Sequence, residues 1–140
     1  MPAHVTLSPR QLLGAIGAVA VGGALGTLAR DLSLTLDPAS TSRSWIAHVP
    51  WVLLAINVVG VFVATVLMRG PLRHHDPNDP WRLWWITGVL GGFTSYSSLF
   101  VALGEIWHLS VLAGIVTGAV AVASGVAAAA AGLRVHWRFR

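Results

Sequence analysis

The 140-residue sequence contains no cysteine, no lysine and only one tyrosine, and 10% of its residues are charged. The absence of cysteine excludes disulfide bonds, thiol catalysis and thiolate metal sites. A soluble domain carries about 25% charged residues, so the low value here, together with 55% hydrophobic residues, indicates an integral membrane protein. The nine arginines lie at the ends of apolar segments rather than in one patch, which does not favour nucleic-acid binding.

Four apolar segments are long enough to cross a bilayer, which takes about 20 helical residues. They lie at about residues 11–30, 51–69, 82–107 and 110–133. The sequence therefore predicts an all-α integral membrane protein, with one membrane domain over residues 1–140 and four transmembrane helices. We expect the first segment to be a span rather than a signal peptide, because a signal peptide has an apolar core of only about 7–15 residues.

The third span contains a run of glycine and hydroxyl residues from Gly88 to Ser98. Each glycine costs about 0.8–1.0 kcal/mol relative to alanine inside a helix, and irregular backbone in a bilayer must be buried in protein or line a cavity. We expect the third helix to be broken centrally. The pattern alone leaves two interpretations open, an ion site made by freed carbonyls and a kinked helix that packs closely against its neighbours.

Small residues in the first span recur at every fourth position, at Gly14, Ala18, Gly22 and Gly26. This spacing places them on one face and predicts a contact with another helix. Arg30 continues the spacing at the end of the span. It is either an interfacial anchor or a partly buried charge that attracts an anion.

Polar side chains inside the second and fourth spans are further candidates. Asn57 is the one strongly polar residue of the second span, with Gly60 on roughly the same face. It either hydrogen-bonds to another helix or donates to an anion in a pore. Ser110, Thr117 and Ser124 recur every seven residues and share a face of the fourth span, where they make interhelical hydrogen bonds or line a polar track.

The distribution of arginine predicts the orientation in the membrane. Four spans place both termini and the loop near residues 69–82 on one side, which holds seven arginines, whereas the other side holds Arg30 and Arg43. The positive-inside rule then predicts a multi-pass plasma-membrane protein with both termini in the cytoplasm.

Three motifs, one in each of the first three spans, resemble those of the Fluc/CrcB family of small four-helix fluoride channels. They are Gly22-Gly23-Ala24-Leu25-Gly26-Thr27-Leu28-Ala29-Arg30, Asn57-Val58-Val59-Gly60 and Gly88-x-x-Gly91-Gly92-Phe93-Thr94-Ser95-Tyr96-Ser97-Ser98. The resemblance implies an antiparallel dimer with two fluoride pores and a structural Na⁺ at its centre. It also implies that the protein is not an enzyme, and no His, Ser and carboxylate converge within the membrane segments.

The resemblance and the residue patterns described above together assign a role to each candidate residue. The backbone carbonyls of Gly91 and Thr94 would hold the Na⁺, and Arg30 would lie in the anion vestibule. The residues that would line the fluoride pore are Asn57, Tyr96, Ser97, Ser98, Leu99, Thr117 and Ser124. Aromatic residues belong in such a pore because the edges of their rings carry positive charge.

Two positions depart from the family pattern, since Tyr96 and Leu99 stand where phenylalanines are expected. The fourth-helix tyrosine of the family also has no counterpart. An antiparallel homodimer should have little arginine bias, so we form the hypothesis that the partner is an oppositely oriented paralogue that supplies the missing rings. A homodimer remains the other possibility for the assembly.

Two other functions are compatible with four small spans. One is a non-conducting scaffold or partner subunit, in which the glycines and serines serve only packing. The other is a small multidrug-type proton-coupled exporter. That function needs a membrane-embedded carboxylate, and the first, second and fourth spans contain none between their ends.

Overall fold

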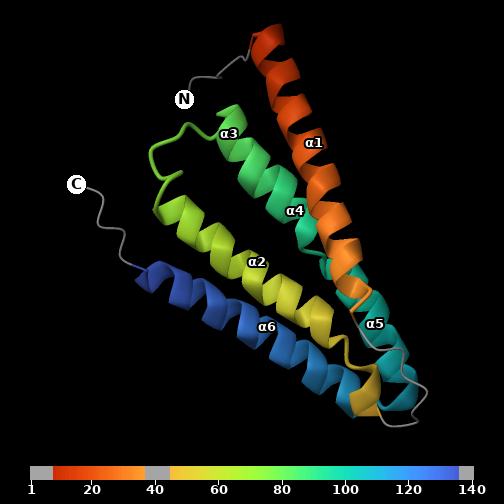
Figure 1. The fold of residues 1–140 in the computed structure, drawn as a ribbon. Helices are drawn as coiled ribbons and strands as arrows, with labels where there is room; N and C mark the ends of the chain where they lie inside the picture. The colour runs from red at the N-terminus through yellow and green to blue at the C-terminus, as the bar shows by residue number, and fades with distance from the viewer. Residues whose placement is uncertain (1–7, 37–44, 136–140) are drawn as a thin grey trace, which may run out of the picture.

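The computed structural model describes residues 8–36 and 45–135, and every regular element in these ranges is a helix (Figure 1). The long helices are α1 (Pro9–Leu34), α2 (Trp51–Arg69), α5 (Tyr96–Leu109) and α6 (Val111–Arg134). The short elements are η1 (Trp45–His48), α3 (Pro80–Arg82), η2 (Leu83–Leu90) and α4 (Gly91–Phe93). Of these, η1 is a 3-10 helix and η2 is π-helical.

Four helical segments of the described chain are long and apolar enough to cross a membrane, as the sequence predicts. The third of them runs from Pro80 to Leu109 and includes α3, η2, α4 and α5. The first extends one turn past Arg30, to Leu34. Arg30 therefore lies within α1 rather than at its end.

Capping residues define where several helices begin. Ser8 and Gln11 form a capping box at the start of α1, with Pro9 at the first helical position. Asp79 caps α3, where its Oδ1 accepts the N–H of Trp81 at 2.8 Å, and its Oδ2 lies 2.8 Å from Nδ1 of His75. The hydrogen bond from His75, supported by that from Trp81, holds the pKa of Asp79 below its ordinary value of 3.8, so this cap stays charged.

The helices form two main contacts. The first helix, α1, packs along η2 and α4, while α2 packs along α6, and α5 also contacts α6. Figure 1 shows that α2 and α6 lie side by side and run in the same direction. The guanidinium of Arg69, at the end of α2, donates to the carbonyl of Leu133 at 3.1 Å and so ties the two C-terminal ends together.

The contact between α1 and the third span is made through glycine. A Cβ on Gly22 would lie 2.8 Å from the carbonyl oxygen of Trp84, and one on Gly26 would overlap the carbonyl oxygen of Val89. Gly22 and Gly26 are both buried. The predicted small-residue contact is therefore confirmed at these two positions, where backbones touch directly.

Gly14 makes no such contact within the described chain, because it is exposed and an added Cβ would meet nothing within 4 Å. The reason is the helical repeat. Four residues turn an α-helix by about 400°, so a strict spacing of four drifts by about 40° at each step. Gly14 lies two such steps from Gly22, and the neighbouring Ala15 is buried in its place.

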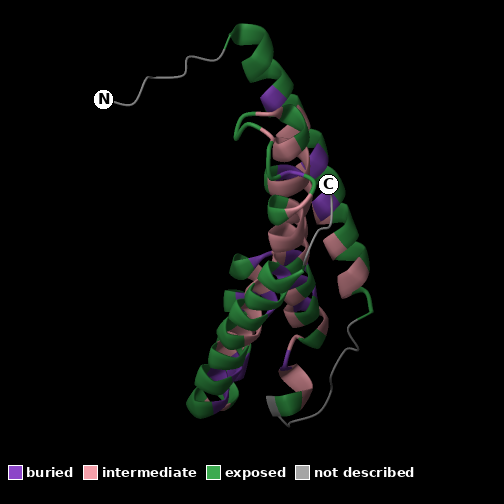
Figure 2. Cartoon of the chain, turned by 90° about the vertical axis from the view of Figure 1, so that its left-hand side faces the viewer, coloured by how far each residue is buried: buried purple, intermediate pink, exposed green. Residues whose placement is uncertain are grey.

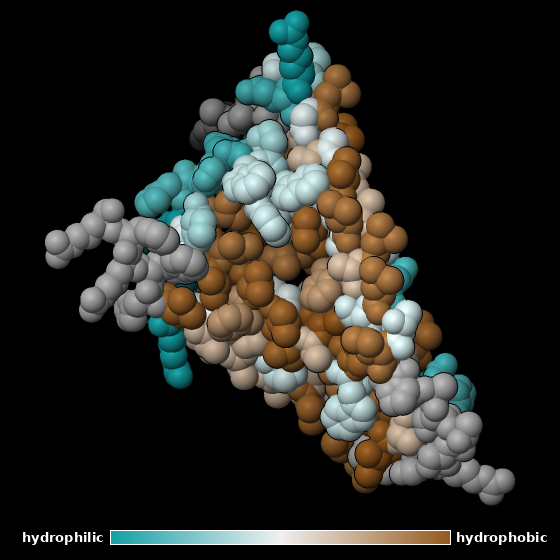
Figure 3. All heavy atoms as spheres, viewed as in Figure 1, coloured by the Kyte–Doolittle hydropathy of each residue, from teal (hydrophilic) through white to brown (hydrophobic). Residues whose placement is uncertain are grey.

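Little of each span is buried inside the chain. In each span, only 17–22% of the residues in its apolar 18-residue stretch are buried. Figure 2 shows exposed residues along most of the helical surface. Figure 3 shows hydrophobic residues across the middle of one face and hydrophilic residues toward its ends. The remaining apolar surface is available to lipid or to another subunit.

Candidate ion site in the third span

Two residues between α4 and α5 have extended rather than helical dihedrals. Thr94 has φ −82° and ψ 147°, and Ser95 has φ −150° and ψ 110°. The N–H and the hydroxyl of Thr94 both donate to the carbonyl of Leu90, each at 2.9 Å. The next helix begins at once, because Ser95 is the N-cap of α5 and its Oγ accepts the N–H of Ser98 at 3.1 Å.

The side chain of Asn57 binds the backbone of this extended segment. Its Oδ1 accepts the N–H of Ser95 at 2.9 Å, and its Nδ2 donates to the carbonyl of Ser95 at 3.3 Å. Asn57 and Ser95 are each only 8% exposed. The N–H and C=O of an extended residue point to the same side, so one primary amide satisfies both, as a neighbouring residue does in an antiparallel ladder.

Gly60 lies one turn after Asn57 on α2 and contacts Thr94, the other extended residue. A Cβ at position 60 would overlap Cγ2 of Thr94. The spacing of three residues in Asn57-x-x-Gly60 places both on one helix face. The two residues of this motif therefore contact the two extended residues, Asn57 with Ser95 and Gly60 with Thr94.

Ser95 also organises a small group of hydroxyls. Its Oγ lies 2.8 Å from Oγ of Ser98 and 3.2 Å from Oγ of Ser97. Ser98 is half-buried, whereas Ser97 is exposed. Ser95 is absent from the candidate residues drawn from the sequence, although a serine directly before a helix is a typical N-cap and this signal points to it.

The aromatic and aliphatic positions of α5 face different ways. Tyr96 is 58% exposed, whereas Leu99 is 5% exposed and lies in the interior of the chain. Phe100 follows Tyr96 by four residues, lies on the same face of the helix and is 71% exposed. Phe100 is therefore an exposed ring next to position 99 that is not among the site residues predicted from the sequence.

The predicted hydroxyl stripe of the fourth span consists of Ser110, Thr117 and Ser124. Thr117 is buried, Ser124 donates to the carbonyl of Ala121 at 3.0 Å, and Ser110 caps its own helix by accepting the N–H of Ala113. Within the described ranges no hydrogen bond links any of these three to Ser97 or Ser98.

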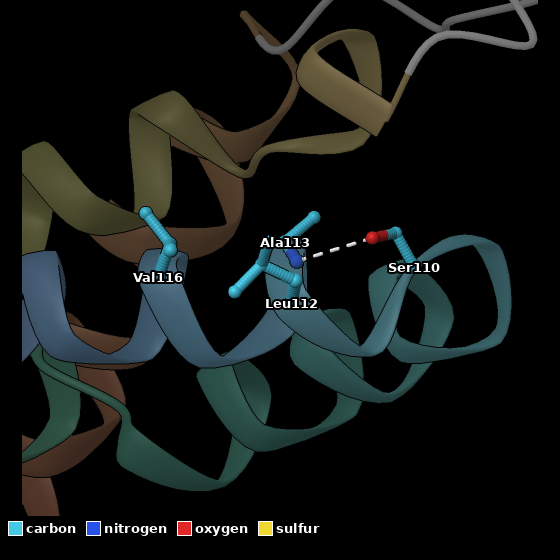
Figure 4. Close-up of a pocket in the computed structure, with 4 residues that line it drawn as sticks. All are labelled: Ser110, Leu112, Ala113 and Val116. Carbon is cyan, nitrogen blue, oxygen red and sulfur yellow. Dashed lines mark hydrogen bonds between the residues drawn. The ribbon is translucent and has the colours of Figure 1, made fainter.

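Ser110 and Ala113 also border a hollow of about 160 Å³ (Figure 4). Leu112 and Val116 complete its lining. Its one hydroxyl, that of Ser110, accepts the N–H of Ala113 at 3.3 Å in the cap, and the rest of its side-chain lining is apolar.

Arg30 is partly buried at the far end of α1. Its Nε lies 3.7 Å from Oδ1 of Asp31 and makes no hydrogen bond to any other described residue. The Nε of Arg30 is thus buried without a hydrogen bond among the described residues.

Backbone carbonyls are the candidate cation ligands. Among the described residues no three His, Asp or Glu side chains gather in a way that holds a metal ion. In a continuous helix the carbonyl of Gly91 would accept the N–H of Ser95, but here that N–H is bound by Asn57. The C-terminal end of α4 therefore presents carbonyls with partial negative charge, and the N-terminal end of α5 presents partial positive charge.

Comparisons with known proteins identify the family to which the chain belongs. Residues 17–133 match the family model described as CrcB-like protein, Camphor Resistance (CrcB). The fluoride-specific ion channel FluC of Agrobacterium fabrum is 36% identical over 120 residues, which cover 80% of this chain and 93% of that protein. FluC 2 of Leifsonia xyli is 40% identical over 123 residues, covering 82% of this chain and 78% of that protein.

A third relative, like that of Leifsonia xyli, carries a number in its name. FluC 1 of Cutibacterium acnes is 42% identical over 94 residues, which cover 64% of this chain and 62% of that protein. The match to the family model includes all of the second and third spans, all of α6 except Arg134, and α1 from residue 17 onward. The chain therefore belongs to the CrcB-like family, whose members named here are fluoride-specific ion channels.

Proposed function

We propose that this protein is a subunit of a passive fluoride channel that lowers cytoplasmic fluoride. The relatives named above are fluoride-specific ion channels, and no covalent chemistry is required of a channel, so the chain is not an enzyme. The observation that carries the proposal is the extended segment Thr94–Ser95, bound by Asn57 deep in the third span. Such irregular backbone is stable in a membrane where it borders protein or an ion path.

The groups around this segment are suited to an anion. Fluoride holds its hydration shell tightly, so a pore must replace water with hydrogen-bond donors. The hydroxyls of Ser97 and Ser98 are such donors, and Nδ2 of Asn57 carries a second N–H beyond the one bound to Ser95. The positive N-terminal end of α5 favours an anion at the same place, and the exposed rings of Tyr96 and Phe100 offer positively charged edges.

The backbone carbonyls of the same region are suited to a cation. We propose that a structural Na⁺ binds the carbonyls of Gly91 and Thr94 at the dimer centre. The oxygen donors and the negative end of α4 suit such a cation, as unwound helix carbonyls do in other membrane proteins. When bound, the ion would neutralise these carbonyls and link the two subunits.

The partner in the dimer is proposed to be an oppositely oriented paralogue. The bias of arginine toward one end supports a single orientation. Of the arginines that make the bias, Arg43, Arg138 and Arg140 lie outside the described residues. Leu99 lies inside the chain and presents no ring edge, so a partner with aromatic residues at both positions would complete one pore.

The test of the channel function is fluoride efflux from liposomes. We expect fluoride to leave vesicles that contain the assembled protein, while chloride leaves at the rate seen in protein-free vesicles. The protein is reconstituted both alone and after co-expression with a paralogue from the same genome. Absence of fluoride efflux in both preparations would contradict the proposal and favour a non-conducting scaffold subunit.

The partner is tested with the same two preparations. A heterodimer predicts that the protein alone inserts in one orientation and conducts little fluoride, whereas the co-expressed pair conducts. Accessibility of a C-terminal tag to protease on sealed vesicles measures the orientation. Insertion in both orientations, with efflux from the protein alone, would instead establish a homodimer.

A further inference from the structure

The two hydrogen bonds between Asn57 and Ser95 point to a role for Asn57 beyond contact with the anion. We infer that Asn57 is a positioning residue for the cation site, because it sets the direction and the availability of the carbonyls of Thr94 and Gly91. The inference rests on the proposed Na⁺ site. Asn57 would then contribute both to the cation site and to the fluoride path.

The direction of the Thr94 carbonyl follows from peptide geometry. The peptide between Thr94 and Ser95 is trans, since the described chain has no cis bond, and a trans peptide is planar with its C=O and N–H opposed. Asn57 Oδ1 holds the N–H of Ser95 at 2.9 Å. The carbonyl of Thr94 must therefore point away from Asn57 and α2.

The side chain of Thr94 fixes the same peptide from the other end. Its hydroxyl donates to the carbonyl of Leu90 at 2.9 Å, and its methyl group fits against Gly60. With the hydroxyl and the methyl both engaged, the residue has little freedom to rotate. The direction of its carbonyl is then set by Asn57 through Ser95.

The availability of the Gly91 carbonyl depends on the same hydrogen bond. The N–H of Ser95 is the donor that would close the next helical turn onto Gly91. By binding this N–H, Asn57 prevents α4 and α5 from joining into one continuous helix at this point. Loss of the Asn57 side chain would free the N–H of Ser95 to return to Gly91.

The experiment compares Asn57→Ala with Asn57→Asp in the assembled channel. Aspartate retains an oxygen that accepts the N–H of Ser95 but loses the amide that donates to the carbonyl of Ser95, whereas alanine loses both. Thermal unfolding in detergent is followed as Na⁺ replaces N-methylglucamine, because a ligand that binds only the folded state raises the Tm. We expect a rise of several degrees for wild type and Asn57→Asp, and no rise for Asn57→Ala.

A matched control separates this role from the fluoride path. Ser97→Ala removes a hydroxyl of the proposed pore but none of the hydrogen bonds that direct the two carbonyls. We expect its Na⁺-dependent rise in Tm to equal that of wild type. Fluoride efflux is measured on the same samples, so that failure of the channel proposal is seen separately from failure of the cation-site role.

A second measurement covers the case in which Asn57→Ala does not fold. Labelling with ¹³C-carbonyl threonine and ¹⁵N serine selects Thr–Ser peptides in solid-state NMR, and the sequence contains two, Thr41–Ser42 and Thr94–Ser95. We expect Na⁺ to shift one of the two carbonyl signals in wild type and in Asn57→Asp. The inference would be overturned if Na⁺ shifted neither carbonyl signal in wild type. It would also be overturned if Asn57→Ala showed the same Na⁺-dependent shift or rise in Tm as wild type.

Discussion

Replacing Gly26 with alanine is expected to destabilise the folded protein by about 3 kcal/mol, at the upper end of the cost of overpacking. The added Cβ would overlap the carbonyl oxygen of Val89 and lie 2.8 Å from the backbone nitrogen of Phe93. Both are backbone atoms, so no side chain can rotate away. The helix α1 must separate from η2 and α4, and the closest contact of the first and third spans is lost.

The measurement is the Tm of the purified protein in detergent, with Gly14→Ala as the control on the same helix. Position 14 is open to an added methyl group within the described chain. Alanine there should be neutral or stabilising by up to about 1 kcal/mol, because it favours the helix over glycine. Equal Tm values for Gly26→Ala and wild type would show that α1 does not approach the third span so closely.

Replacing Gly60 with alanine is expected to reduce fluoride efflux at least about tenfold, which corresponds to about 1.4 kcal/mol in the barrier. The new Cβ would overlap Cγ2 of Thr94. Rotation of that side chain would relieve the overlap but would break the hydrogen bond from Oγ1 to the carbonyl of Leu90. Either response moves the extended segment that the channel is proposed to use.

A second substitution makes this prediction specific. Thr94→Ser removes the methyl group and keeps the hydroxyl, so the double variant Gly60→Ala with Thr94→Ser should recover most of the efflux. Thr94→Ser alone should conduct nearly as wild type does. Residues in contact commonly show coupling energies of about 0.5–3 kcal/mol, and additive effects of the two changes would contradict a direct contact between these side chains.

The four spans could be predicted because hydropathy is a local property of the sequence. Uncharged segments of about 20 residues have few alternatives to a membrane helix, and the described chain contains four such helices. The contact through Gly22 and Gly26 could also be predicted from spacing. The contact within the chain does not extend to Gly14, because a spacing of four does not match 3.6 residues per turn.

The geometry of the candidate site could be predicted only in part. Asn57 and the residues near Thr94 stand out in the sequence, but their pairing joins positions 38 residues apart, and periodicity carries no signal of it. The same holds for Leu99, whose burial depends on which face of α5 meets the rest of the chain. The π-helical turns of η2 could not be predicted either, because such turns are rare and have no simple periodic pattern.

The even number of spans has a practical consequence for distance measurements. Figure 1 shows that α1 begins at the same end of the molecule at which α2 and α6 finish, and the hydrogen bond from Arg69 to Leu133 fixes the last turn of α6 there. Probes attached near residue 134 on two opposed subunits would lie on opposite faces of the bilayer, at least about 30 Å apart. On two parallel subunits they would share one face, so energy transfer between such probes reports the relative direction of the two chains.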